Sequence, residues 1–151
     1  MKALSKGEII VALNQDLIAE LGALEMYRAH GQAISEDAIA QGVRAILSVE
    51  EGHAANLTSR IRELGGIPAQ PGGAATVVGR AAGAAGSFAG TIDMLKLELG
   101  EEQQAIKDYS AQVADIVNDD GTLALLERNL QDEMEHARWL KAQIHSLETR
   151  T

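Results

Sequence analysis

The stretch Glu50-Glu-Gly-His53 decides the fold of this 151-residue chain, because it returns in the second half as Glu133-Met-Glu-His136. On an α-helix, residues three apart lie on one face, so each stretch can present a carboxylate and an imidazole to one metal ion. A single Glu-x-x-His match is weak evidence in a glutamate-rich chain. Two matches embedded in a longer repeat indicate two copies of one structural unit.

A second pattern precedes each copy at nearly the same distance along the chain. It reads Glu20-Leu-Gly-Ala-Leu-Glu-Met-Tyr27 in the first half and Glu102-Gln-Gln-Ala-Ile-Lys-Asp-Tyr109 in the second. Seven residues return to nearly the same azimuth of a helix, so each tyrosine should share the inward face of its glutamate. Two helical hairpins with these patterns have the ligand set of a carboxylate-bridged two-metal site in a four-helix bundle.

The candidate metal ligands are therefore Glu20, Glu50, His53, Glu102, Glu133 and His136. Their four carboxylates would repel one another without metal, and two divalent cations would neutralise them. Glu98 and Glu101 flank Glu102, which is preferred because only it matches the first-half repeat. His30 and His145 have no glutamate three residues before them, so we expect surface histidines or histidines bonded elsewhere.

Composition excludes several classes of function. A net charge of −9 and a pI near 4.8 argue against partners such as nucleic acid or an anionic membrane surface. The absence of cysteine excludes disulfides, cysteine-bound zinc and iron–sulfur clusters. The amino-terminal stretch has no apolar segment and no run approaches about 18 apolar residues, so we expect a cytoplasmic protein without an integral membrane segment.

Hydrophobic periodicity and end signals predict an all-α chain that forms a single domain over residues 1–151. The expected helices run from Ser5, in the capping box Ser5-Lys-Gly-Glu8, to about Ala33, from Ser35 to Gly65, from about Thr91 to Val117, and from about Thr122 to Leu147. Residues 65–90 are rich in glycine and alanine and long enough for a crossover between parallel second and third helices. A short helix is expected near 77–85.

The second-half pattern Asp132-Glu133-x-x-His136-x-x-Trp139-Leu140 resembles the ferritin-like superfamily, and the resemblance extends from about Leu13 to Ile144. Leu64-Gly-Gly-Ile-Pro68, together with the stretch from Leu13 to Tyr27, resembles bacterioferritins and rubrerythrin-like proteins. The pattern Glu20-x-Gly-Ala-x-x-x-Tyr27-x-x-x-Gly-Gln32 also resembles the demethoxyubiquinone hydroxylases. All these relatives imply a ferritin-like four-helix bundle.

The resemblance also implies a role for each candidate residue. Glu20 and Glu102 would be terminal ligands, Glu50 and Glu133 would bridge the metals, and His53 and His136 would cap one metal each. Tyr27 would hydrogen-bond a ligand carboxylate and is the candidate catalytic residue. Glu51 stands where bacterioferritins place a haem-ligating methionine, so no haem is expected. The implied cofactors are two iron ions, with manganese as the alternative.

Three functions remain open from the sequence. The first is a non-haem di-iron oxidoreductase that oxidises Fe(II) with dioxygen or peroxide. The second is a di-iron monooxygenase that acts on an organic substrate, as the demethoxyubiquinone hydroxylases do. The third is a metal-free helical interaction module. The fifth short helix of cage-forming ferritins is missing, so we expect a smaller homo-oligomer, a dimer.

Overall fold

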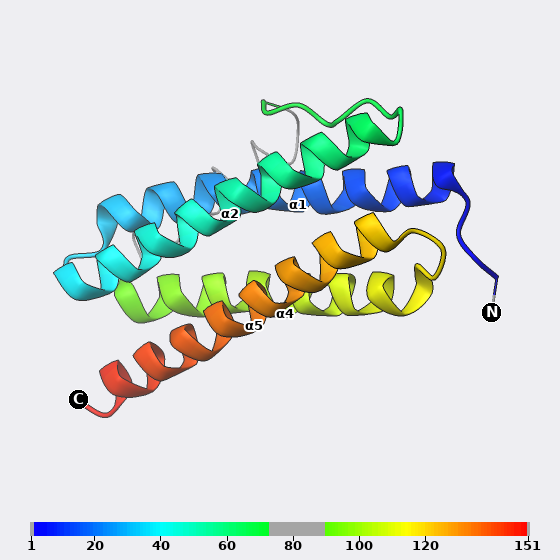
Figure 1. Ribbon diagram of the computed structural model, residues 1–151. Coiled ribbons are helices and arrows are strands. Elements are labelled where there is room, and N and C mark those ends of the chain that lie inside the picture. Colours follow the sequence, from blue (N-terminus) through cyan, green and yellow to red (C-terminus); the bar gives the residue numbers. More distant parts are fainter. Residues whose placement is uncertain (1, 73–89, 151) are drawn as a thin grey trace.

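The computed structural model describes residues 2–72 and 90–150, and their only regular secondary structure is helical. The four long helices are α1 (Lys6–Ala33), α2 (Asp37–Glu63), α4 (Thr91–Asp115) and α5 (Asp120–Glu148). They lie side by side as an elongated bundle (Figure 1). The predicted all-α four-helix bundle is therefore confirmed.

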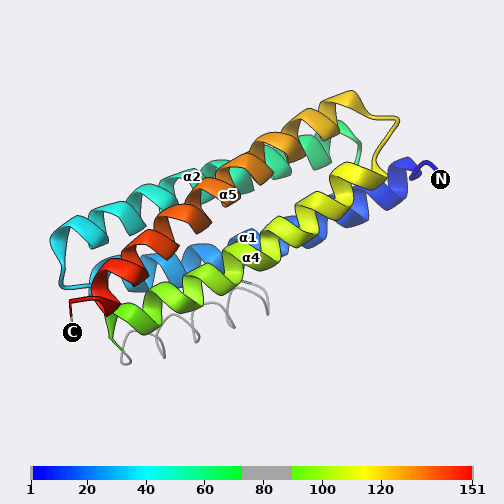
Figure 2. The same ribbon diagram turned by 90° about the horizontal axis from the view of Figure 1, so that it is seen from below.

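The bundle is built from two helical hairpins, as the repeat predicts. α1 packs against α2 and α4 packs against α5, while α1–α4 and α2–α5 contacts join the hairpins. The view from below shows α1 beside α4 and α2 beside α5 (Figure 2). α2 and α4 begin at the same end of the bundle and run parallel, which is the topology that a long crossover permits. The short helix expected near 77–85 lies outside the described residues.

Capping chemistry explains where the helices begin. The Ser5 hydroxyl accepts from the Glu8 backbone N–H, and the Glu8 carboxylate accepts from the Ser5 N–H, which confirms the predicted capping box. The prediction that Ser35 starts the second helix was wrong, because α2 begins at Asp37. Ser35 instead donates its hydroxyl to the Glu36 carboxylate and leaves no side-chain cap on α2.

The ends of the second hairpin also differ from prediction. α4 ends at Asp115, short of the predicted Val117. α5 begins at Asp120 because the Asp119 carboxylate caps it by accepting from the Thr122 backbone N–H. Local capping by Asp119 thus lengthens α5 beyond the predicted start at Thr122.

Apolar side chains form two buried clusters, each of which includes one of the inward tyrosines. One cluster comprises Ile9, Leu13, Leu17, Leu24, Ala54, Leu57, Ile61, Tyr109, Ile116, Leu125 and Leu126. The other comprises Met26, Tyr27, Ile34, Ile39, Ala40, Val43, Ile46, Met94, Leu95, Leu140 and Ile144. Each fully buried leucine or isoleucine adds about 1.5–3 kcal/mol of transfer free energy, which favours closing the bundle around a polar centre.

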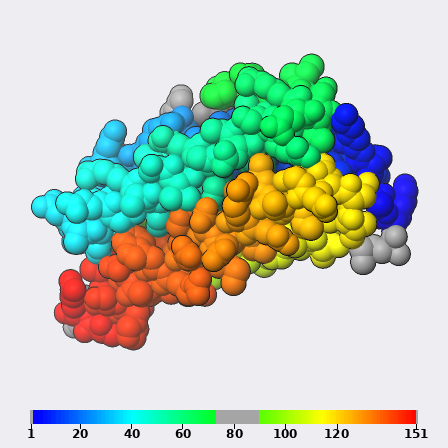
Figure 3. Space-filling view, in the orientation of Figure 1, coloured from blue at the N-terminus to red at the C-terminus, as the bar shows by residue number. Residues whose placement is uncertain are grey.

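One glycine sets the distance between α2 and α5. A Cβ atom at Gly42 would lie 2.1 Å from Cζ2 of Trp139, so the indole of α5 packs directly on the α2 backbone. Figure 3 shows the face on which these two helices meet along the molecule. Among the described helices, none has the length and apolar character needed to cross a membrane.

Candidate metal centre

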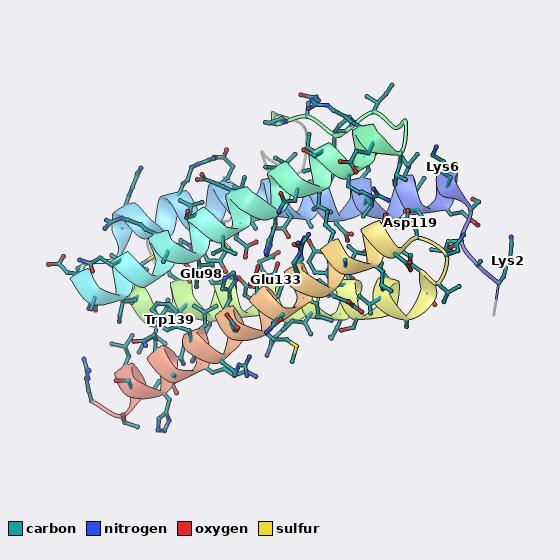
Figure 4. The ribbon with its side chains drawn as sticks, viewed as in Figure 1. Lys2, Lys6, Glu98, Asp119, Glu133 and Trp139 are labelled. Carbon is teal, nitrogen blue, oxygen red and sulfur yellow. The ribbon has the colours of Figure 1, made fainter. Side chains whose placement is uncertain are left out.

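The structure brings all six candidate ligands together in the middle of the bundle. Each helix contributes at least one of them, and all are buried, with exposed fractions of 1–8%. Figure 4 shows Glu133 midway along the bundle, among the side chains between the helices. Burying four carboxylates at one point is costly unless cations compensate them, so this cluster needs a chemical explanation.

The two histidines point the same ring atom toward the carboxylates. Nδ1 of His53 lies 3.0 Å from Glu50, 3.1 Å from Glu133 and 3.4 Å from Glu20. Nδ1 of His136 lies 3.1 Å from Glu50 and 3.5 Å from both Glu102 and Glu133. The ring centroids are 6.4 Å apart, so each imidazole faces its own part of the cluster.

The side chains divide into two overlapping sets of four. Glu20, Glu50, His53 and Glu133 bring ligand atoms within 4.8 Å of one another, and so do Glu50, Glu102, Glu133 and His136. Glu50 and Glu133 belong to both sets. These are the two residues that the resemblance implies as bridges.

The electrostatics of the cluster are those of crowded carboxylates. Burial raises the pKa of Glu20 to about 8, and the nearby Glu50 carboxylate adds to the rise. Burial likewise raises the pKa of Glu133 to about 7 and that of Glu50 above its usual range. For Glu102, burial acts in the same direction, but hydrogen bonds, first of all from His136, hold its pKa below the usual value. Without metal, the centre must therefore hold protons at neutral pH.

The histidines hold part of that proton load. Burial alone would lower the pKa of His136, but its contacts with Glu102, Glu133 and Glu50 outweigh burial and raise it to about 12. The pKa of His53 is raised for the same reason by Glu133, Glu20 and Glu50. In the protonated form, each histidine donates its Nδ1–H to a carboxylate. Its positive charge then neutralises part of the cluster, as a metal ion would.

The donor set fits metal ions. Oε1 of Glu133 and Oε2 of Glu102 are buried, and neither accepts a well-aligned hydrogen bond among the described residues. Each lies only near a histidine Nδ1, at 3.1 Å and 3.5 Å, which also faces other carboxylates. Buried acceptors of this kind require an explanation, and a bound cation supplies one. Carboxylate oxygens with one imidazole per position suit iron or manganese, since each set offers three carboxylates and one imidazole.

Each inward tyrosine bonds to the opposite hairpin. Tyr109 on α4 donates its hydroxyl to Glu20 on α1 at 2.6 Å, and Tyr27 on α1 donates to Glu102 on α4. Both phenols are buried, and burial is the main reason that their pKa values stay well above 10. The tyrosines therefore act as neutral donors that orient the two glutamates.

A further pair of bonds joins α1 to α4 one turn beyond the ligands, and sequence reasoning missed it. Gln112 donates its amide to Asp16 at 2.7 Å on one side, and His30 contacts Glu98 at 2.9 Å on the other. His30 is thus fully buried and bonded elsewhere, through Nδ1 to Glu98, which is one of the two outcomes expected for it. Its Nε2 has no hydrogen-bond partner among the described residues. Burial raises the pKa of Asp16 to about 7.

The same repeat could have revealed these pairs. The offset that relates Tyr27 to Tyr109 also relates Asp16 to Glu98 and His30 to Gln112. The signal was missed because the residue types differ between the halves. The carboxylate is Asp in one copy and Glu in the other, and its partner changes from amide to imidazole.

A small cavity connects the centre with the surface between α1 and α4. Its volume is about 50 Å³, room for a few water-sized molecules, and it reaches Glu20, Glu50, Glu102 and Glu133. Its outer part is lined by residues that include the exposed Ala19, Glu101 and Asp108. Glu101 therefore belongs to the mouth of the cavity and not to the cluster.

The fold and the cluster together define a four-helix protein with a buried carboxylate–histidine centre. The model of the ferritin-like domain family matches residues 10–149, and this chain belongs to that family. No match was found among curated proteins. The resemblance drawn from the repeated glutamates and histidines is thereby confirmed at the level of the superfamily.

Solved structures with the same fold include close matches over nearly the whole chain. A dodecameric thioferritin, the bacterioferritin-related protein of Bacteroides fragilis, superposes with a TM-score of 0.79 at 20% identity, over 97% of this chain and 90% of that one. A ferritin-like diiron-carboxylate protein of Bacillus anthracis gives 0.72 at 25% identity, over 93% and 99%. The bacterioferritin of Rhodobacter capsulatus gives 0.70 at 29% identity, over 99% and 89%.

Proposed function

We propose that the chain is a di-iron oxidoreductase whose centre binds two iron ions through the six clustered side chains and oxidises Fe(II) with dioxygen or peroxide. The observation that carries the proposal is the pair of overlapping ligand sets that share Glu50 and Glu133. Two iron ions held by these residues would supply one electron each to dioxygen or peroxide. The family relationship and the diiron-carboxylate relative support iron as the metal.

The residues of the chain have separate tasks in this proposal. Glu20 and Glu102 are held by the opposite tyrosines, so each ligand is fixed before an ion arrives. The cavity between α1 and α4 admits small molecules such as dioxygen or peroxide to the carboxylates. Tyr27 is the candidate catalytic residue, since its hydroxyl contacts Glu102 and lines the same cavity.

Oxygen uptake by the metal-free protein after anaerobic addition of Fe(II) tests the proposal. We expect uptake with Fe(II) alone, together with conversion of Fe(II) to Fe(III). Glu133→Ala, which removes a shared ligand, should abolish the stimulated rate, whereas the exposed Glu135→Ala should retain it. Uptake only when a quinol is present would favour the monooxygenase instead, and absence of metal binding would favour the interaction module.

We also propose that the chain forms a homo-oligomer, with the dimer as the basic unit. Val11 and Ile18 lie two turns apart on α1 and are 58% and 43% exposed, so one face of the helix presents apolar side chains. The dodecameric relative supports assembly in general. Light scattering should give twice the chain mass, and Ile18→Glu should shift it toward the monomer.

A further inference from the structure

The two halves of the metal centre receive unequal support from the residues around them. The repeat relates α5 to α2, so that Glu133 corresponds to Glu50 and His136 to His53. By the same offset, the residue before Glu133, which is Asp132, corresponds to Val49. A carboxylate in one half is therefore matched by an apolar side chain in the other.

This difference falls on the histidines. Nε2 of His53 lies 2.9 Å from the Asp132 carboxylate, which fixes the ring with Nδ1 facing the cluster. The contacts of His136 within residues 2–72 and 90–150 are all made by Nδ1, and the Val49 side chain offers no acceptor to Nε2. A carboxylate bonded to the outer nitrogen of an imidazole orients the ring and strengthens it as a ligand.

A second difference between the halves involves the tyrosines, and it too favours the Glu20–His53 half. Asn129 donates its amide to the Tyr109 hydroxyl at 3.3 Å, and that hydroxyl donates to Glu20. The residue that corresponds to Asn129 is Ile46, which is buried and apolar. Tyr27, which bonds Glu102, therefore has no matching amide. Both additional hydrogen bonds support the Glu20–His53 half.

We infer that the two metal positions are inequivalent: the Glu20–His53 position binds first and retains its ion, and the Glu102–His136 position binds more weakly and exchanges its ion. The inference rests on the proposed function. Hydrogen-bond partners of metal ligands typically change metal affinity by about 10–100-fold, and this sets the expected difference between the positions. Asp132 is accordingly a positioning residue that acts through His53.

Calorimetric and visible-absorption titration of the metal-free protein with Co(II) tests the inference. We expect two binding steps in the unsubstituted protein, separated by about 10–100-fold in affinity. Asp132→Val should weaken the tighter step and leave the weaker one unchanged. Val49→Asp supplies the missing acceptor at a position that is already 37% exposed, so it should tighten the weaker step.

Two exposed positions provide matched controls for charge. Glu135→Gln removes one negative charge from α5, and Ser48→Asp adds one to α2 beside Val49; neither should change the separation of the steps. Two equal steps in the unsubstituted protein, or an Asp132→Val variant that weakens only the weaker step, would overturn the inference. Failure to bind two ions would instead overturn the proposed function.

Discussion

The hydroxyl groups of Tyr27 and Tyr109 show how single residues build this centre, because each crosses between hairpins to hold a glutamate of the other. Removing one hydroxyl would leave a buried carboxylate oxygen without its donor. The glutamate would then be less well oriented and would bind metal more weakly. Tyr109→Phe keeps the ring in its apolar cluster and removes the hydroxyl, with its bond to Glu20 and the bond that it accepts from Asn129. We expect about a 10-fold loss of metal affinity, measured by Co(II) titration. An unchanged affinity would show that Glu20 needs no orientation.

Proton release is a second prediction at the scale of single residues. The raised pKa values of Glu20, Glu133 and His136 mean that the metal-free centre holds protons at pH 7. Metal binding should release them, because ligands bind in their deprotonated forms. Calorimetry in two buffers with different ionisation enthalpies should then give different apparent binding enthalpies. Equal enthalpies in both buffers would contradict the charge-crowded centre.

The same pKa shifts set the pH dependence of stability. Asp16, Glu20 and Glu133 bind protons more tightly in the folded than in the unfolded chain, so the stability that these protons provide is lost as pH rises through about 7–8. The raised pKa of His136 likewise lowers the stability as pH rises, but at higher pH. Melting temperatures of the metal-free protein should therefore fall between pH 6 and pH 9. Asp16→Asn, which touches no ligand, should flatten this decline.

At the scale of helices, close packing of α2 on α5 keeps both Glu-x-x-His stretches at the centre. Gly42→Ala would force a methyl group into the Trp139 ring, and we expect a loss of about 1–3 kcal/mol from this overpacking. Gly52→Ala on the same helix meets nothing within 4 Å and should raise stability by up to about 1 kcal/mol. Thermal unfolding of both variants compares them. Equal effects would show that the contact with Trp139 is unimportant.

The sequence predicted the helices better than their ends. Ser5 marked the start of α1 because its capping box is encoded within one helical turn, and the inward faces followed from periodicity. The start of α2 was misplaced because Ser35 bonds to Glu36, a choice between two local partners that spacing does not determine. Partners such as Glu98 and His30 lie far apart in the sequence and are brought together only by packing of α1 on α4.

At the scale of the molecule, two apolar clusters enclose one polar centre. Metal binding should therefore stabilise the fold without being required for folding. The metal-free protein retains both clusters and should stay folded, unlike a small zinc finger. A metal at a hundredfold excess over its Kd should add about 2.7 kcal/mol. For a chain of this size, that corresponds to roughly 5–10 °C in melting temperature. Scanning calorimetry with and without Mn(II) measures the shift, and no shift would indicate that metal does not bind the folded state.

The most direct test of the central claim is the number of metal ions bound per chain. We predict two ions in the unsubstituted protein, measured by elemental analysis after loading with Fe(II) under anaerobic conditions. Glu50→Ala should reduce occupancy of both positions because Glu50 belongs to both ligand sets, whereas Ala at the exposed neighbour Glu51 or at His30 should leave two ions in place. One ion per chain, or full occupancy in Glu50→Ala, would contradict a single-bundle centre with shared carboxylates.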